Sequence, residues 1–190
     1  MSSGDSNLPL PDLPAGPAPR RRSITPLIVA GVAILAVAAL AYAFAGGRKS
    51  ELQVGQPAPA FRVATREGVQ IDSQTLRSSV VVVNFFASWC KPCQEEAADL
   101  EAVWQDYKNR GVAFVGITYQ DVDAKVVEFV QRNGVTYLIG NDDGRVARAF
   151  GVTGVPETYV IGRDGILAFK KIGAIDAGEL RRTLDALLTR

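Results

Sequence analysis

Along residues 52–190, the apolar positions follow two different patterns, one typical of strands and one typical of helices. Residues 80–86 form a nearly continuous run of β-branched and aromatic side chains, a pattern typical of a strand buried on both faces. Residues 112–118 carry a second such run, and between the two the apolar positions recur at the spacing of an amphipathic helix that starts after Cys90. Strands that alternate with helices favour parallel pairing. We therefore predict an α/β domain with 80–86 as a central strand.

Shorter signals on either side complete this prediction. Extended segments that flank Gly-containing turns indicate two hairpins. Asp123 and Gly134 are placed to begin and end a helix, and Asp176 with Glu179 has the spacing of a capping box before a final amphipathic helix. The other segments expected are a hairpin of 61–64 with 68–71, a short extended piece at 135–140, a short helix at 145–150, and a hairpin of 158–161 with 166–170.

The N-terminal part of the chain has a different composition. Residues 1–23 are rich in proline and contain three consecutive arginines, so we predict a disordered cytoplasmic tail. Residues 24–45 carry no charge and are long enough to span a bilayer as a helix; the excess of cations before them places the N-terminus in the cytoplasm. We predict a signal anchor at 24–45, a linker at 46–51 and one folded domain at 52–190. Because Ala43–Phe44–Ala45 resembles a signal-peptidase site, cleavage and release of the domain is the alternative.

Composition excludes several classes of function. The 190 residues have a formal net charge of +1 and no stretch of interleaved basic and aromatic side chains, so nucleic acid is not an expected partner. The chain contains no histidine, which removes the commonest catalytic base and metal ligand. Its aspartates do not follow the order of a calcium loop, and we interpret them as caps and turns. No metal site is therefore predicted.

The candidate chemistry lies in Cys90 and Cys93, the only two cysteines of the chain. They follow the strand predicted at 80–86, at the start of the next helix. Unpaired backbone N–H groups and the positive end of the helix dipole favour a thiolate there. We expect Cys90 to occupy the exposed helix end and Cys93 to lie one turn inside, less open to solvent. This arrangement points to dithiol–disulfide exchange.

Three motifs occur in order along the chain: VGQPAP at 54–59, VNFFASWCKPC at 83–93 and GVPET at 154–158. Together with the predicted anchor, they resemble the membrane-anchored TlpA/ResA-like thiol-disulfide oxidoreductases, a group that includes the cytochrome c maturation thioredoxins. The resemblance covers 52–190. It implies a thioredoxin-like three-layer α/β sandwich, with an N-terminal β extension and a central insert around 119–143. It also implies that the Val155–Pro156 peptide bond is cis, which the residues alone do not establish.

The resemblance implies that Cys90, Cys93 and Glu96 are catalytic, with Glu96 accepting or returning a proton during exchange. From the residues alone, Glu96 is interpreted as a favourable charge in the first turn of a helix. Asn84 departs from ordinary thioredoxins, in which a buried aspartate lies beneath the dithiol. Because an amide cannot exchange a proton near neutral pH, this departure fits the membrane-anchored branch.

Substrate binding is expected around the cis proline. By match to the motif, Gly154, Val155 and Pro156 offer their backbone to an extended client segment, as an added strand would. Glu157 is a further candidate, with the alternative that its carboxylate only solvates the loop. Trp89 is expected to be a packed lid over the site that contacts the substrate.

These residues lead to one hypothesis: reduced Cys90 attacks a disulfide of an extracytoplasmic protein, and Cys93 resolves the mixed disulfide. The resemblance implies apocytochrome c or a similar client, and a membrane thiol-reductant transporter as the source of electrons. No cofactor is expected beyond the redox-active Cys90–Cys93 disulfide. The catalytic domain is expected on the periplasmic side of the cytoplasmic membrane. The alternatives are a peroxiredoxin-type thiol peroxidase, suggested by Gln56–Pro59, and a copper-binding chaperone.

Overall fold

The computed structural model describes residues 25–46 and 52–189 of the chain, which divides into two units, Met1–Arg48 and Lys49–Arg190. The first unit contains helix α1 (Thr25–Gly46). Within the residues described in full, no helix is both long and apolar enough to cross a membrane. The span expected at 24–45 therefore stays a prediction. The predicted tail at 1–23 lies outside the described residues, as does the predicted linker at 46–51 apart from Gly46.

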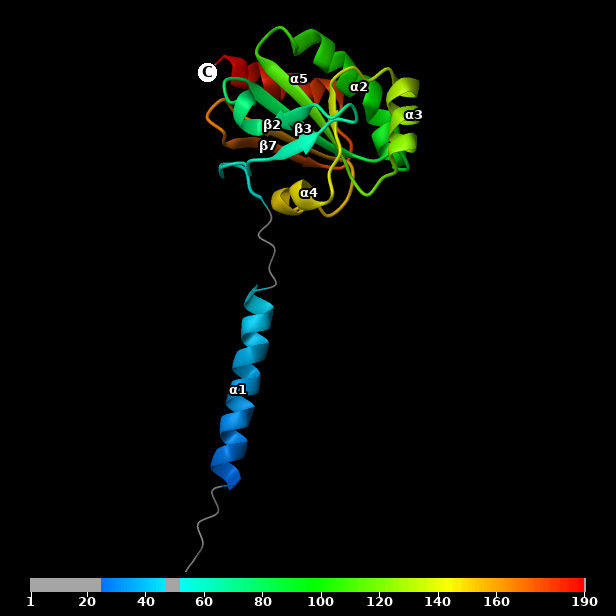
Figure 1. The fold of residues 1–190 in the computed structure, drawn as a ribbon. Helices are drawn as coiled ribbons and strands as arrows, with labels where there is room; N and C mark the ends of the chain where they lie inside the picture. Colours follow the sequence, from blue (N-terminus) through cyan, green and yellow to red (C-terminus); the bar gives the residue numbers. More distant parts are fainter. Residues whose placement is uncertain (1–24, 47–51, 190) are drawn as a thin grey trace, which may run out of the picture. The chain divides into compact units, whose positions relative to one another are not determined.

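In the described part of the second unit, five strands form one sheet in the order β5-β4-β3-β6-β7 (Figure 1). The central strand β3 pairs in parallel with β4 and antiparallel with β6. The outer pairs are β4 with β5, in parallel, and the hairpin of β6 with β7. The predicted central strand, the parallel pairing and the second hairpin are thereby confirmed. The strands are β3 (Val80–Phe86), β4 (Val112–Thr118), β5 (Leu138–Gly140), β6 (Glu157–Ile161) and β7 (Leu167–Ile172).

Helices cover both faces of the sheet, which gives the three layers expected (Figure 1). Buried side chains of α2 (Lys91–Tyr107), α3 (Asp123–Asn133) and α5 (Ala177–Leu188) form one apolar cluster. The opposite face is covered by α4 (Arg145–Phe150) and by the predicted first hairpin. That hairpin consists of β1 (Arg62–Ala64) and β2 (Gln70–Asp72), and the short 3-10 helix η1 (Ser73–Leu76) follows it.

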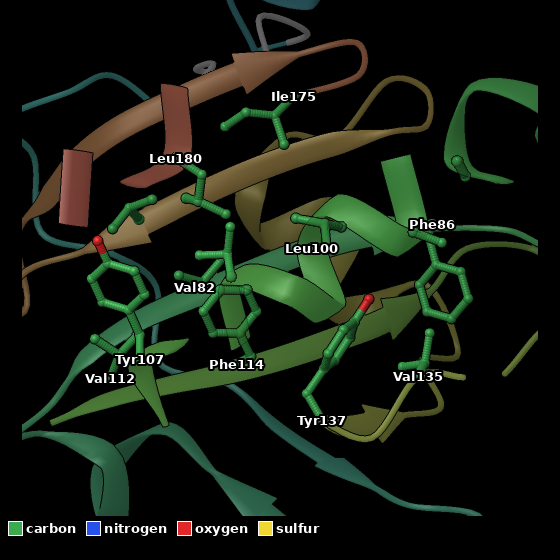
Figure 2. Packing of buried hydrophobic residues seen from close by; sticks show 14 of the residues in the cluster. Val82, Phe86, Leu100, Tyr107, Val112, Phe114, Val135, Tyr137, Ile175 and Leu180 are labelled. Carbon is green, nitrogen blue, oxygen red and sulfur yellow. The ribbon is translucent and has the colours of Figure 1, made fainter. Parts of the chain in front are cut away.

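The alternation of side chains along β3 determines what lies beneath α2. Val82 and Phe86 belong to the apolar layer shared with α2 and α5 (Figure 2), whereas Val83 and Phe85 belong to the layer under α4. Because successive side chains of a strand point to opposite faces, Asn84 lies on the α2 face. A polar group therefore enters an otherwise apolar layer at the place where β3 leads to the cysteines.

One predicted helix cap and one half of the predicted capping box differ from the structure. Asp123 is the first residue of α3 rather than its cap, and the capping position is Val122, which has no side-chain acceptor. At the other end, Gly134 adopts the left-handed conformation (φ 63°) that was expected to terminate the helix. Asp176 does cap α5, accepting a hydrogen bond of 2.9 Å from the N–H of Glu179. In a capping box, the Glu179 carboxylate would accept a bond from the backbone N–H of Asp176. Here it accepts a bond from Lys171 instead.

Candidate functional site

The two cysteines form a disulfide at the junction of β3 and α2, with Cα atoms 5.3 Å apart. Cys90 is the N-cap of α2 and has extended backbone angles, while Pro92 lies in the first turn. The Sγ of Cys90 accepts a hydrogen bond of 3.1 Å from the backbone N–H of Cys93. A helix N-terminal amide therefore points at the sulfur of Cys90, and the same contact stabilises a thiolate there once the disulfide is reduced.

Cys90 is more buried than the sequence suggested. Cys90 is 4% exposed and Cys93 is 1% exposed, so the predicted order holds but the predicted exposure of Cys90 is wrong. The physical reason is that both side chains belong to the apolar layer under α2, against which Val155 packs. Trp89 is 58% exposed, and its indole N–H donates to the backbone oxygen of Gln120. Trp89 is therefore not the packed lid that was predicted.

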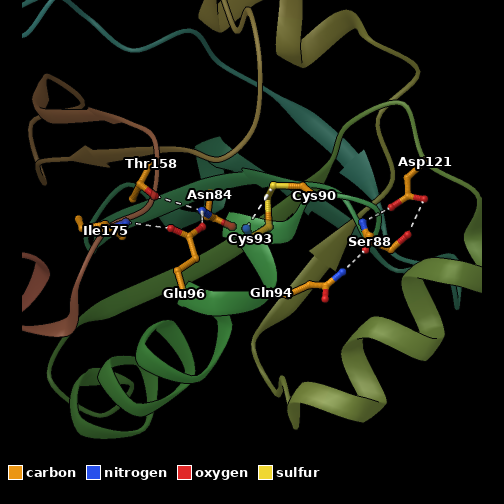
Figure 3. Close-up of a disulfide and its surroundings, with 9 residues drawn as sticks. All are labelled: Asn84, Ser88, Cys90, Cys93, Gln94, Glu96, Asp121, Thr158 and Ile175. Carbon is orange, nitrogen blue, oxygen red and sulfur yellow. Dashed lines mark hydrogen bonds between the residues drawn. A yellow bond between two sulfur atoms is a disulfide. The ribbon is translucent and has the colours of Figure 1, made fainter.

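A buried polar network lies beside the disulfide (Figure 3). The Asn84 amide donates to Oε1 of Glu96 at 2.9 Å and to the Thr158 hydroxyl at 3.1 Å. The other carboxyl oxygen of Glu96 accepts a bond of 2.9 Å from the backbone N–H of Ile175. Glu96 is only 3% exposed. Its carboxyl group is thus held by one residue from β3 and one from the loop before α5.

Burial raises the pKa of Glu96 from 4.5 to about 7, and the hydrogen bonds from Ile175 and Asn84 oppose this shift only partly. Glu96 lies three residues after Cys93 on α2, so the two Cβ atoms are about 5–6 Å apart. This carboxyl group can therefore take up or release a proton near neutral pH, one helical turn from Cys93.

The loop before β6 lies on the same side of the domain as the disulfide. Because β6 runs antiparallel to β3, with Glu157 opposite Phe85, the beginning of β6 is beside the end of β3. The Val155–Pro156 bond is cis, as the resemblance implied. Val155 packs against the apolar cluster that contains both cysteines. Glu157 is 1% exposed, and its carboxylate is bonded to the loop and to Tyr159 rather than to solvent.

One contributor to the site, Asp121, was interpreted from sequence only as a turn residue. Its carboxylate accepts bonds from the N–H and the hydroxyl of Ser88, two residues before Cys90. The predicted parallel pairing could have indicated this contact, because the carboxyl ends of the parallel strands β3 and β4 meet at one edge of the sheet. The loops that follow these strands are therefore neighbours. Ile175 carried no comparable signal, because its contribution is a backbone N–H.

Asp142 and Asp164 act as a cap and a turn residue, as interpreted, whereas Asp123 does not cap α3. Asp142 accepts from two backbone N–H groups at the start of α4, and Asp164 accepts from the N–H of Ile166 in the β6–β7 turn. Across the residues that the structure describes, no group of three or more Cys, Asp or Glu side chains is placed to hold a metal ion.

Comparisons with known proteins agree with this geometry. Residues 54–170 match the AhpC/TSA family. The chain is 31% identical over 126 residues to the thiol-disulfide oxidoreductase ResA of Bacillus thuringiensis (strain Al Hakam), covering 66% of this chain and 73% of that protein. It is 29% identical over 144 residues to the thiol:disulfide interchange protein DsbE of Allochromatium vinosum, covering 72% and 76%.

Among solved structures, a thioredoxin-family thiol:disulfide interchange protein from Chlorobium tepidum superposes with a TM-score of 0.66 at 28% identity, over 73% of this chain and 99% of that one. The thioredoxin-like α/β fold is thereby confirmed. The CxxC disulfide, the buried carboxyl group beside it and these relatives lead to one assignment. The chain belongs to the AhpC/TSA family and is a thiol-disulfide oxidoreductase of the ResA/DsbE type.

Proposed function

We propose that this thiol-disulfide oxidoreductase reduces disulfides of client proteins outside the cytoplasm. In the first step, the thiolate of Cys90 attacks one sulfur of the client disulfide, forming a mixed disulfide and releasing one client thiolate, which takes up a proton. In the second step, Cys93 attacks Cys90 and releases the second client thiol. Two electrons pass to the client, and the Cys90–Cys93 disulfide remains.

Glu96 is the residue that we propose for proton transfer in the second step. Cys93 must lose its proton to become a nucleophile, and a carboxylate with a pKa of about 7 lies one helical turn away. Asn84 and the N–H of Ile175 keep that carboxyl group in place. This buried carboxyl group next to the buried cysteine is the observation that carries the proposal.

The same carboxyl group supports reduction rather than oxidation as the net direction. A negative charge close to the dithiol opposes the formation of a thiolate, so the reduced form gains less stabilisation than it would in a purely cationic site. A less stabilised reduced form has a lower reduction potential and gives its electrons away more readily.

The partners and the location follow the resemblance of the motifs. We propose apocytochrome c or a similar disulfide-containing protein as the client, and a membrane thiol-reductant transporter as the electron donor. Residues 24–45 are proposed as the membrane anchor, with the catalytic domain on the periplasmic side. Trp89, Gly154, Val155, Pro156 and Glu157 are proposed to form or support the surface that receives the client.

Trapping in cells tests the proposal. A Cys93→Ser variant should accumulate a disulfide-linked complex through Cys90 that mass spectrometry can name, because the resolving thiol is absent. The matched Cys90→Ser variant should trap nothing. Wild-type protein should reduce the disulfides of insulin when a thiol donor is supplied. Absence of trapping together with absence of insulin reduction would contradict the proposal, and rapid peroxide consumption by Cys90 would favour a thiol peroxidase.

A further inference from the structure

A second buried carboxyl group, Glu157, lies at the start of β6 and faces away from the disulfide. Its neighbour Thr158 points toward Asn84 and Glu96 (Figure 3). Successive side chains of a strand alternate between faces, so Glu157 lies on the opposite face with Tyr159. The Tyr159 hydroxyl donates to Oε2 of Glu157 at 2.5 Å. The Glu157 side chain therefore lies on the face of β6 that is turned away from the two cysteine sulfur atoms.

Its other carboxyl oxygen is bonded to the loop that precedes the cis proline. Oε1 of Glu157 accepts bonds from the backbone N–H of Thr153 at 3.0 Å and of Gly154 at 3.4 Å. The Thr153 hydroxyl lies 3.5 Å from the same oxygen. A carboxylate only accepts hydrogen bonds, and bonds from backbone N–H groups to such a group are among the stronger ones. The loop is thus tied to β6 by a side chain that is itself 1% exposed.

These bonds decide which backbone groups of the loop remain for a client. The N–H groups of Thr153 and Gly154 are occupied, and Pro156 has none. Within the described residues, the N–H of Val155 has no hydrogen-bond acceptor. Only one donor of the loop is therefore open, and it lies next to the cluster that contains Cys90.

We propose that Glu157 is a positioning residue that fixes the register of the client on this loop. By occupying two neighbouring donors, it leaves Val155 as the single N–H that an extended client segment can pair with, and so places the client disulfide opposite Cys90. This inference rests on the proposed reduction of client disulfides. It assigns Glu157 a role through the loop, without contact to the reacting sulfur atoms.

Steady-state kinetics on full-length variants test this role. Leucine fills a volume similar to that of glutamate but has no oxygen to accept the hydrogen bonds from the loop. In Glu157→Leu, the KM for a disulfide-bonded peptide should therefore rise about tenfold, with kcat unchanged. Glu157→Gln should restore the wild-type KM, because its carbonyl accepts from the loop while the Tyr159 hydroxyl can turn toward the Phe150 carbonyl, 3.4 Å away. Tyr159→Phe is the matched control and should leave the KM unchanged, since the loop bonds are intact.

Reaction with dithiobis(nitrobenzoate), a disulfide without a peptide backbone, distinguishes a failure of the proposed function from a failure of the role of Glu157. All four proteins should react with it at the same rate. A wild-type protein that reduces neither substrate would overturn the proposed function. A wild-type protein that reduces both, with an unchanged peptide KM in Glu157→Leu or an equally raised KM in Glu157→Gln, would overturn the role of Glu157 alone.

Hydrogen exchange on the wild-type protein provides a test that does not depend on a variant that folds. The amides of Thr153 and Gly154 should be protected in the free protein, and that of Val155 should exchange faster. Saturation with the disulfide-bonded peptide should slow exchange at Val155. Equal protection of all three amides in the free protein would refute the inference.

Discussion

The replacement Glu96→Gln tests the environment of the buried carboxyl group through protein stability. Burial raises the pKa of Glu96 from 4.5 to about 7, and one pKa unit corresponds to about 1.4 kcal/mol. Keeping this carboxylate charged in the folded protein therefore costs about 3 kcal/mol of stability. Below pH 4.5 the group is protonated in both the folded and the unfolded chain, so the cost is absent; it grows between the two pKa values and is complete above about 7.

Glutamine does not titrate, so the variant lacks this pH-dependent cost. Its carbonyl can accept from Ile175, and its amide can donate to Asn84 after rotation of the Asn84 amide. Relative to the variant, the oxidised wild-type protein should lose about 2–3 kcal/mol of unfolding free energy between about pH 5 and about pH 8.

Urea unfolding of the oxidised proteins at these two pH values, followed by circular dichroism, measures the difference. Glu95→Gln is the matched control, because Glu95 is the exposed neighbour that faces Lys91 on the helix surface and Glu96 remains intact. The control should follow the pH dependence of the wild type. If the difference between wild type and Glu96→Gln is the same at both pH values, the raised pKa and the proton-transfer role built on it are refuted.

Two further predictions concern the scaffold of the site. In Gly140→Ala, the added Cβ would lie 2.2 Å from a methyl carbon of Val63, so the first hairpin must shift and urea unfolding should show a loss of about 1–3 kcal/mol; an unchanged midpoint would contradict the packing of the hairpin on β5. In Asp176→Ala, the acceptor for the Glu179 N–H is lost and stability should fall by about 1 kcal/mol, whereas Asp176→Ser should retain most of it; equal losses in the two variants would show that the cap bond is not the cause.

Local patterns predicted the elements of the fold because each acts within a few residues. The run at 80–86 indicated a strand buried on both faces, and all seven residues of β3 are buried. Gly134 ended its helix where expected because only the local backbone conformation decides that position. The cis state of Val155–Pro156 has no local signal, and it was predicted only through the resemblance.

The site was harder to predict because its contacts join distant segments. Ile175 is 79 positions from Glu96 in sequence, and it contributes only its backbone N–H. The direction of Glu157 followed from the phase of β6, which a shift of one residue would have reversed. The indole N–H of Trp89 donates to the backbone oxygen of Gln120, on a loop after another strand. Residue identity therefore indicated which side chains matter, whereas tertiary pairing decides what each one contacts.

The central claim is that Cys90 is the nucleophile because a helix N-terminal amide points at its sulfur. Alkylation of the reduced protein by iodoacetamide across a pH series, with each cysteine followed by mass spectrometry, measures this directly. We predict that Cys90 reacts first and with a midpoint below the value of about 8.5 for a free cysteine, while Cys93 stays protected. Equal rates at the two cysteines, both with the midpoint of a free thiol, would contradict the account.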